Sequence, residues 1–183
     1  MHYEVEQKFP APDLEAIKHA IIQRGATEGP TVTQVDTYYA HPVRDYATTD
    51  EALRIRRVDD KNVFTYKGPK IDATTKTRQE IELEFADGLA GAEQGDQLLE
   101  SLGFRRVANV SKVRQTYHLQ QADQSIEFAL DTIAGLGTYV ELEIIAEGED
   151  EMQSAQQTIK TLATDLNLTQ PERSSYLELL LEQ

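Results

Sequence analysis

Charged and apolar residues alternate along most of the segments of this chain that have the composition of β-strands. The first segment, from Tyr3 to Phe9, carries Glu4, Glu6 and Lys8 at every second position. Because successive side chains of a strand point to opposite faces of a sheet, these three charges share one face. Further strands are predicted at Asp36–Tyr39, Arg54–Arg56, Val63–Lys67, Arg78–Phe85, Lys112–Leu119, Ser125–Asp131 and Val140–Ile144. The fold therefore has to accommodate many strand faces that are strongly ionised.

The ionised faces are sorted by the sign of their charge. Arg54 and Arg56 put two guanidinium groups on one strand face, whereas Glu141 and Glu143 put two carboxylates on another. One interpretation is the solvated face of an open antiparallel sheet. The other is a sheet that curls into a barrel, with helices on its apolar side and the charges lining its interior.

Helical patterns separate several of the predicted strands. Apolar spacing and end signals predict helices over Pro12–Arg24, Gln94–Leu102, Glu149–Leu166 and Ser174–Leu181. The polar stretch from His41 to Asp50 is predicted as a loop. A strand with a Glu-x-Glu pattern leads into a helix three times, which indicates a duplicated α+β unit rather than a solenoid.

Composition limits the partners and the compartment. The 183 residues include 32 acidic and 18 basic ones, and the resulting net charge of −14 argues against nucleic acid or an anionic membrane as a direct partner. There is no cysteine, which excludes disulfides and thiolate metal sites. No apolar run is long enough to span a bilayer, and the chain begins directly with a strand pattern. We therefore expect one soluble, cytoplasmic domain.

Closure of the sheet would bring charges together that need mutual compensation. If Glu4, Glu6, Asp131, Glu141 and Glu143 converge, cations are needed to keep these carboxylates ionised. Carboxylate oxygens suit Mg²⁺, which commonly takes substrate phosphates as further ligands.

Bases of the same interior would bind the phosphates. Arginine binds phosphate oxygens in a bidentate fashion, and lysine acts as a point charge. The bases predicted for this role are Arg54, Arg56, Lys67, Lys112 and Arg114. Metal carboxylates combined with phosphate clamps indicate phosphoryl or nucleotidyl transfer.

The order of these motifs resembles that of the CYTH superfamily, the triphosphate tunnel metalloenzymes, and within it the CyaB-type class IV adenylyl cyclases. The motifs are ExExK at Glu4–Lys8, RxR at Arg54–Arg56, the strand lysine Lys67, RxExE at Arg78–Glu82, KxR at Lys112–Arg114, Asp131 before a Gly-Leu-Gly turn, and ExE at Glu141–Glu143. The segments Asp36–Tyr39 and Arg173–Tyr176 are also similar to the CyaB type. The resemblance covers essentially the whole chain.

The resemblance implies an α+β fold, a single domain over residues 1–183 with a closed eight-stranded antiparallel tunnel. It implies that Mg²⁺ or Mn²⁺ is bound by Glu4, Glu6, Asp131, Glu141 and Glu143, with Glu80 and Glu82 as further candidates. It implies that the triphosphate is held by Arg54, Arg56, Lys67, Arg78, Lys112 and Arg114, and that Lys8, Lys67 and Arg114 act in catalysis. Lys8 would orient or deprotonate the nucleophile, or contact phosphate. The resemblance also allows a homodimer, for which the apolar segment from Tyr176 to Leu181 is one candidate contact.

Three functions remain open at this level. An adenylyl cyclase would direct the ribose 3′-hydroxyl of ATP to the α-phosphorus, with pyrophosphate as the leaving group. A hydrolase would direct water to a terminal phosphate of thiamine triphosphate or inorganic tripolyphosphate. A binding module would hold a triphosphate without turnover. The likeness to CyaB-type chains favours the cyclase.

Overall fold

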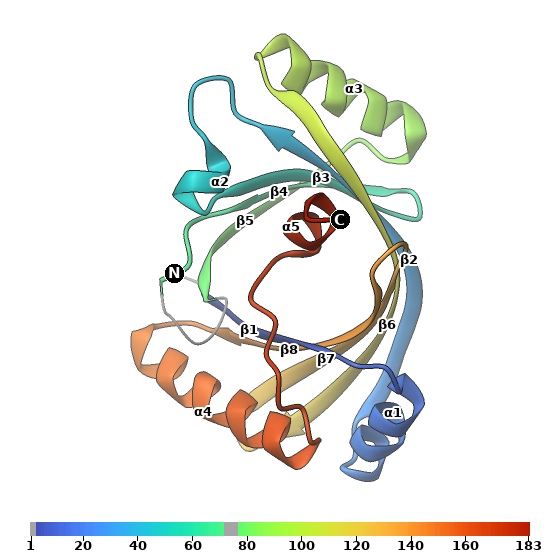
Figure 1. The fold of residues 1–183 in the computed structure, drawn as a ribbon, viewed down its shortest axis with the longest axis vertical. Coiled ribbons are helices and arrows are strands. Elements are labelled where there is room, and N and C mark those ends of the chain that lie inside the picture. The colour runs from blue at the N-terminus through green and yellow to red at the C-terminus, as the bar shows by residue number, and fades with distance from the viewer. Residues whose placement is uncertain (1–2, 72–76) are drawn as a thin grey trace.

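The computed structural model describes residues 3–71 and 77–183 and shows a closed antiparallel barrel (Figure 1). Neighbouring strands follow the order β1-β5-β4-β3-β2-β6-β7-β8, and β8 pairs with β1 to close the ring. The strands are β1 (Tyr3–Pro10), β2 (Thr27–Ala40), β3 (Ala52–Val58), β4 (Lys61–Lys67), β5 (Arg78–Phe85), β6 (Arg105–Gln121), β7 (Gln124–Ile133) and β8 (Gly137–Ala146). The eight-stranded α+β barrel predicted from the sequence is confirmed.

Helices pack against the outside of the barrel (Figure 1). The helices of the chain are α1 (Leu14–Gln23), α2 (Tyr46–Thr49), α3 (Gly88–Ser101), α4 (Glu149–Asp165) and α5 (Tyr176–Leu181). The largest core joins the apolar faces of β1, β7 and β8 to α1 and α4, with Val5, Phe128 and Leu142 packed among Ile21 and Ile159. A smaller core joins α3 to β3 and β4. Because the apolar strand faces point outward to these helices, the ionised faces point inward.

Two helical expectations need correction. Helix α3 begins at Gly88 rather than at Gln94, because its first turns contain glycines whose low helix propensity hides the pattern. The stretch predicted as a loop contains the one-turn helix α2, which the Asp45 side chain caps by accepting a hydrogen bond from the Ala47 backbone amide. The left-handed backbone of Asp50, with φ of 55°, ends this turn.

The three Glu-x-Glu strands lie side by side. In the barrel, β1 stands between β5 and β8, so the repeated unit seen in the sequence gathers its carboxylates on one wall. The pairing of β1 with β5 is short: in the described part of the chain it consists of Tyr3 opposite Gln79 and Glu4 opposite Arg78.

The last part of the chain, residues 172–181, is called the C-terminal segment below. It runs across the opening of the barrel and ends in α5 (Figure 1). The Glu172 backbone amide donates to the Lys8 carbonyl oxygen at 2.7 Å, and Leu177, Leu179 and Leu180 pack around a buried cluster with Val110. The apolar side of this segment, a candidate dimer contact in the sequence, is thus largely used within its own barrel, and the homodimer stays a prediction. No described helix combines the length and apolar character needed to cross a membrane.

Packing of α3 makes Gly95 a test of this architecture. A Cβ at Gly95 would lie 2.7 Å from the Phe85 ring and 3.1 Å from the Phe64 ring, and these two rings stack at 4.2 Å. We expect Gly95→Ala to lower the free energy of unfolding by roughly 1–2 kcal/mol, since overpacking outweighs the gain in helix propensity. Urea denaturation measures the difference.

Gly148→Ala is the matched control, because nothing lies within 4 Å of a Cβ built at Gly148. Its cost should be about 0.5 kcal/mol, because alanine is a poorer N-cap than glycine at the start of α4. Equal stability of Gly95→Ala and wild type would contradict the packing described here.

Candidate active site

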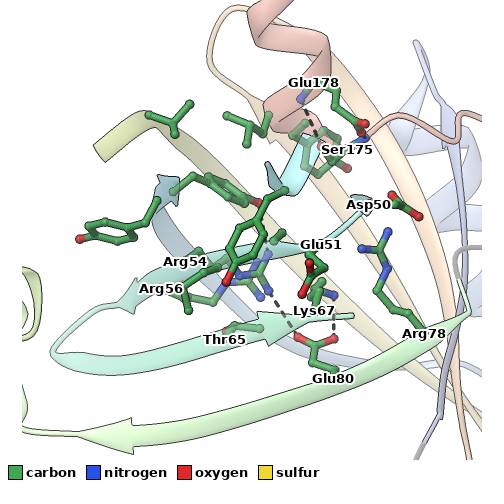
Figure 2. A pocket seen from close by; sticks show the side chains of 18 of the residues that line it. Asp50, Glu51, Arg54, Arg56, Thr65, Lys67, Arg78, Glu80, Ser175 and Glu178 are labelled. Atoms are coloured by element: carbon green, nitrogen blue, oxygen red, sulfur yellow. Dashed lines mark hydrogen bonds and ion pairs between the residues drawn. The ribbon is translucent and has the colours of Figure 1, made fainter. Parts of the chain in front are cut away.

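A cavity of about 1090 Å³ occupies the barrel interior. It is lined by most of the site residues predicted from the sequence: Glu4, Glu6, Arg54, Arg56, Lys67, Arg78, Glu80, Glu82, Lys112, Arg114, Glu141 and Glu143. Figure 2 shows Arg54, Arg56, Lys67 and Glu80 converging from strands β3, β4 and β5. The interior of the barrel is therefore charged, as the alternation predicted.

Asp36 on β2 holds the arginines of β3. Arg56 donates to its two carboxylate oxygens at 2.8 Å each, and Arg54 donates to Oδ2 at 3.3 Å. Register explains the contact, because Asp36 lies directly opposite Arg56. Burial works to raise the pKa of Asp36, but Arg54 and Arg56 outweigh it and hold this pKa well below its ordinary value. The carboxylate thus fixes both guanidinium groups at the cavity wall.

Asp131 on β7 holds the bases of β6 in the same way. Arg114 donates to its two oxygens at 2.7 and 2.6 Å, and Lys112 donates to Oδ2 at 3.2 Å. Arg114 also forms an ion pair with Glu141, and Tyr176 donates to Asp131 Oδ2 at 3.0 Å. Asp131 has no exposed surface and does not line the cavity. Its oxygens serve the bases here, and the metal role implied by the family resemblance stays a prediction.

Lys112 is the least stably charged of these bases. Burial, followed by the charge of Arg114, lowers the pKa of Lys112 to about 8, although Asp131 and Glu141 oppose the change. A phosphate oxygen entering the cavity would place a further anion beside Lys112 and favour its charged form.

Lys67 on β4 bridges two carboxylates. Its Nζ atom lies 2.7 Å from Glu4 Oε2 and 2.7 Å from Glu80 Oε2, while Arg54 approaches Glu80 at 3.7 Å. Burial raises the pKa of Glu4 despite the opposing charge of Lys67. This bridge links β1 to β4 and β5 beside the short pairing of β1 with β5.

A row of carboxylates forms the wall opposite the arginines. Glu6, Glu143 and Glu127 are direct register neighbours on β1, β8 and β7. Like charges placed opposite each other on a sheet destabilise it. Burial and the charges of Glu4 and Glu6 raise the pKa of Glu143 well above its ordinary value. Among the described residues, the carboxylates of this wall therefore disfavour each other's ionised forms.

The chemistry of this wall fits a hard divalent cation, since such ions prefer carboxylate oxygens and would relieve the repulsion. Among the described residues, no three acidic or histidine side chains already converge closely enough to form a metal site. Binding would require new side-chain rotamers, with Glu4, Glu6 and Glu143 as the best-placed donors on the cavity wall.

Arg78 is the first residue of β5 and lies at the edge of the cavity. It donates to the Gly68 carbonyl oxygen at 3.3 Å and points toward Asp50 (Figure 2). Asp50 in turn binds Lys70 at 2.6 Å and so ties the α2 region to the start of the β4–β5 connection.

Lys8 is placed differently from the other bases. It has no exposed surface, does not line the cavity, and donates to the Ser174 carbonyl oxygen at 2.5 Å. Its Nζ atom also lies 3.9 Å from the centre of the Tyr176 ring. The ammonium faces the C-terminal segment rather than the cavity, and its catalytic role stays a prediction.

Sequence reasoning left some cavity residues without a role. Gln34 lines the cavity, and no described hydrogen-bond partner is found for its buried Oε1 atom. In the sequence, Asp36 stands out only as part of the segment that is similar to the CyaB type. Its position two residues before Tyr38 indicates that both side chains lie on the same face of the strand. Both adjacent tyrosines line the cavity: Tyr38 packs with Val110 and Tyr176, whereas the hydroxyl of Tyr39 donates to Asp96 of α3 at 2.7 Å. The contribution of Tyr176 depends on a contact between residues far apart in sequence.

The mouth of the cavity differs in character from its interior. Apolar and aromatic side chains line it from the α2 region and from α5, among them Val43, Tyr46, Leu177 and Leu181. A ligand with a polyanionic end and an aromatic or apolar end would match both parts.

Comparison with known proteins gives this arrangement its family. The CYTH domain model matches residues 2–176, and the chain belongs to the CYTH domain family, as the motifs predicted. A protein of Methanocaldococcus jannaschii, named as a candidate adenylate cyclase, is 35% identical over 178 residues, with 96% of this chain and 97% of that protein aligned. The adenylate cyclase CyaB of Aeromonas hydrophila is 27% identical, with 95% and 86% covered. The solved structure of the PH1819 protein from Pyrococcus horikoshii is similar at a TM-score of 0.86, with 37% identity and 98% of each chain covered.

The Asp36 cluster makes stability depend on pH. The folded-state pKa of Asp36 lies below its unfolded-state value of about 4. Its stabilising contribution is therefore complete above about pH 4 and is lost as the pH falls further. We expect Asp36→Asn to cost about 3–5 kcal/mol at pH 7, because the buried Arg54 and the partly buried Arg56 lose their carboxylate.

Denaturation of both proteins between pH 7 and pH 3 checks this expectation. The difference between wild type and variant should stay constant down to about pH 5 and shrink below pH 4. Asp123→Asn, at an exposed turn, is the control and should cost less than about 0.5 kcal/mol. A difference that grows on acidification would contradict the assignment.

Proposed function

We propose that this protein is a metal-dependent adenylyl cyclase that converts ATP into cyclic AMP and pyrophosphate inside the barrel. The observation that carries the proposal is the division of the cavity between a basic side, organised by Asp36 and Asp131, and a wall of neighbouring carboxylates. The volume of about 1090 Å³ exceeds what a triphosphate chain alone requires and reaches the upper range of organic-ligand pockets. The names of the related proteins support the same reaction.

Binding of the triphosphate is assigned to the basic side. Arg54 and Arg56 are held by one carboxylate, and Arg114 and Lys112 by another, so their geometry is fixed before substrate enters. Fixed donors aimed at developing charge stabilise a transition state without reorganisation. Arg114 and Lys67 would neutralise the charge that accumulates on the departing pyrophosphate.

A divalent cation held by Glu4, Glu6 and Glu143 would supply charge neutralisation and polarise the reacting phosphate. The contribution of the chain itself is position. The apolar mouth between the α2 region and α5 would hold the adenosine part, and the bases would hold the phosphates. The ribose 3′-hydroxyl then attacks the α-phosphorus in line with the leaving pyrophosphate.

Turnover of purified protein with Mg²⁺ or Mn²⁺ tests the proposal. The substrates are ATP, thiamine triphosphate and inorganic tripolyphosphate, and the products are separated by chromatography. Cyclic AMP together with pyrophosphate is the expected result. Release of orthophosphate would identify a hydrolase instead, and tight binding without product would identify a binding module.

The carboxylate wall provides a second prediction. We expect chelation of divalent cations to abolish turnover and Glu143→Gln to lower kcat/KM at least about a hundredfold, with activity partly restored at higher Mg²⁺. Titration of activity with Mg²⁺ gives the apparent metal affinity. Glu149→Gln, at the exposed start of α4, is the control and should match wild type. Unchanged metal dependence in Glu143→Gln would remove this wall from the metal site.

A further inference from the structure

Tyr176 stands where the C-terminal segment meets the phosphate-binding bases. Its side chain is 7% exposed, and its hydroxyl donates to Asp131 Oδ2 at 3.0 Å. Two ammonium groups lie near its ring, with Lys8 Nζ 3.9 Å and Lys112 Nζ 5.2 Å from the ring centre. A buried aromatic face attracts such cations through its quadrupole.

The carboxylate that Tyr176 contacts is the one that fixes Arg114 and Lys112. Both bases line the cavity, whereas Asp131 lies behind them. The Oδ2 atom of Asp131 accepts from Lys112, Arg114 and Tyr176 together. Loss of one donor from such a buried network changes the position and strength of the others. The phenol is thus placed to control the two bases through their shared acceptor.

The C-terminal segment holds Tyr176 firmly in this position. Ser175 and Glu178 form a reciprocal capping box at the start of α5, and the Lys8 ammonium binds the Ser174 carbonyl oxygen. The Tyr139 ring packs edge-on against the Tyr176 ring at 5.3 Å. These contacts fix the direction of the hydroxyl before any ligand binds.

We propose that Tyr176 is a positioning residue of the triphosphate site, which orients Lys112 and Arg114 through Asp131. The C-terminal segment is then a part of the site and not only a cover over the barrel. This inference rests on the proposed function, because it assumes that these bases bind a triphosphate. In this role the Tyr176 ring contacts the ammonium groups of Lys8 and Lys112, and the Tyr176 hydroxyl donates to the Asp131 carboxylate.

Tyr176→Phe separates the two contributions, because it keeps the ring and removes the hydrogen bond. Tyr139→Phe is the matched control: it removes a hydroxyl from the same cluster, and among the described hydrogen bonds none joins that hydroxyl to Asp131, its cross-strand neighbour. The affinity for inorganic tripolyphosphate is measured by calorimetry at 25 °C with Mg²⁺, together with kcat and KM for ATP and the melting temperature. We expect about tenfold weaker tripolyphosphate binding and a raised KM in Tyr176→Phe, and less than twofold change in Tyr139→Phe.

The outcomes separate the two levels of the argument. Failure of the wild-type protein to bind tripolyphosphate or ATP would overturn the proposed function and this inference with it. Normal wild-type binding with an unchanged Tyr176→Phe variant would overturn the inference alone. A lowered melting temperature with unchanged affinity at 25 °C would show a merely structural tyrosine and would also overturn it.

A double-mutant cycle tests whether Tyr176 acts through Asp131. In an Asp131→Asn background, adding Tyr176→Phe should weaken tripolyphosphate binding less than twofold, because the shared acceptor is already altered. A full tenfold additional loss would overturn the path through Asp131. Should Asp131→Asn fail to fold, the single variant still decides whether Tyr176 affects the site.

Discussion

Compensation of buried charge is the constraint on which the rest of this structure depends. Closure of the barrel removes many ionised side chains from bulk water, and an unpaired buried charge costs several kcal/mol. Asp36 and Asp131 satisfy this constraint on the basic side, since each binds two bases of a neighbouring strand. On the acidic side, Lys67 offsets Glu4 and Glu80, whereas burial and the neighbouring carboxylates Glu4 and Glu6 raise the pKa of Glu143. Among the described residues, the two walls of the barrel thus differ in how their buried charges are stabilised.

That asymmetry connects the fold to the proposed reaction. A triphosphate brings the anions that a cluster of bases prefers, and a divalent cation brings the charge that the carboxylate row lacks. The two would meet in the cavity between the walls, with the apolar mouth available for the organic part of the substrate. Residues behind the cavity wall matter because they set the rotamers of those that line it, and Asp131 illustrates this for Arg114 and Lys112.

The C-terminal segment shows the limits of reasoning from pattern alone. Its apolar residues predicted a helix, which is confirmed as α5, and allowed a surface contact between two copies. The structure instead places Leu177, Leu179 and Leu180 against the barrel's own residues, with Ser174 and Tyr176 beside Lys8. Lys8 lies on the same face of β1 as Glu4 and Glu6, as the alternation of residues predicted. Nothing in that alternation could show that a segment more than 160 residues later would take up its ammonium.

The sequence by itself determined the strands, the inward face of each, and the set of charges that would line an interior, because these follow from a period of two and from local composition. It also contains the motifs of the CYTH family in order, and these motifs predict the closed barrel. Which carboxylate serves which base follows from the three-dimensional arrangement: Asp36 binds Arg54 and Arg56, and Asp131 binds Arg114 and Lys112. The same arrangement buries Glu143 beside Glu4 and Glu6, which raises its pKa. Register and closure bring together residues that are distant in sequence, and burial fixes the strength of each interaction, so neither can be obtained from the alternation of residues along one strand.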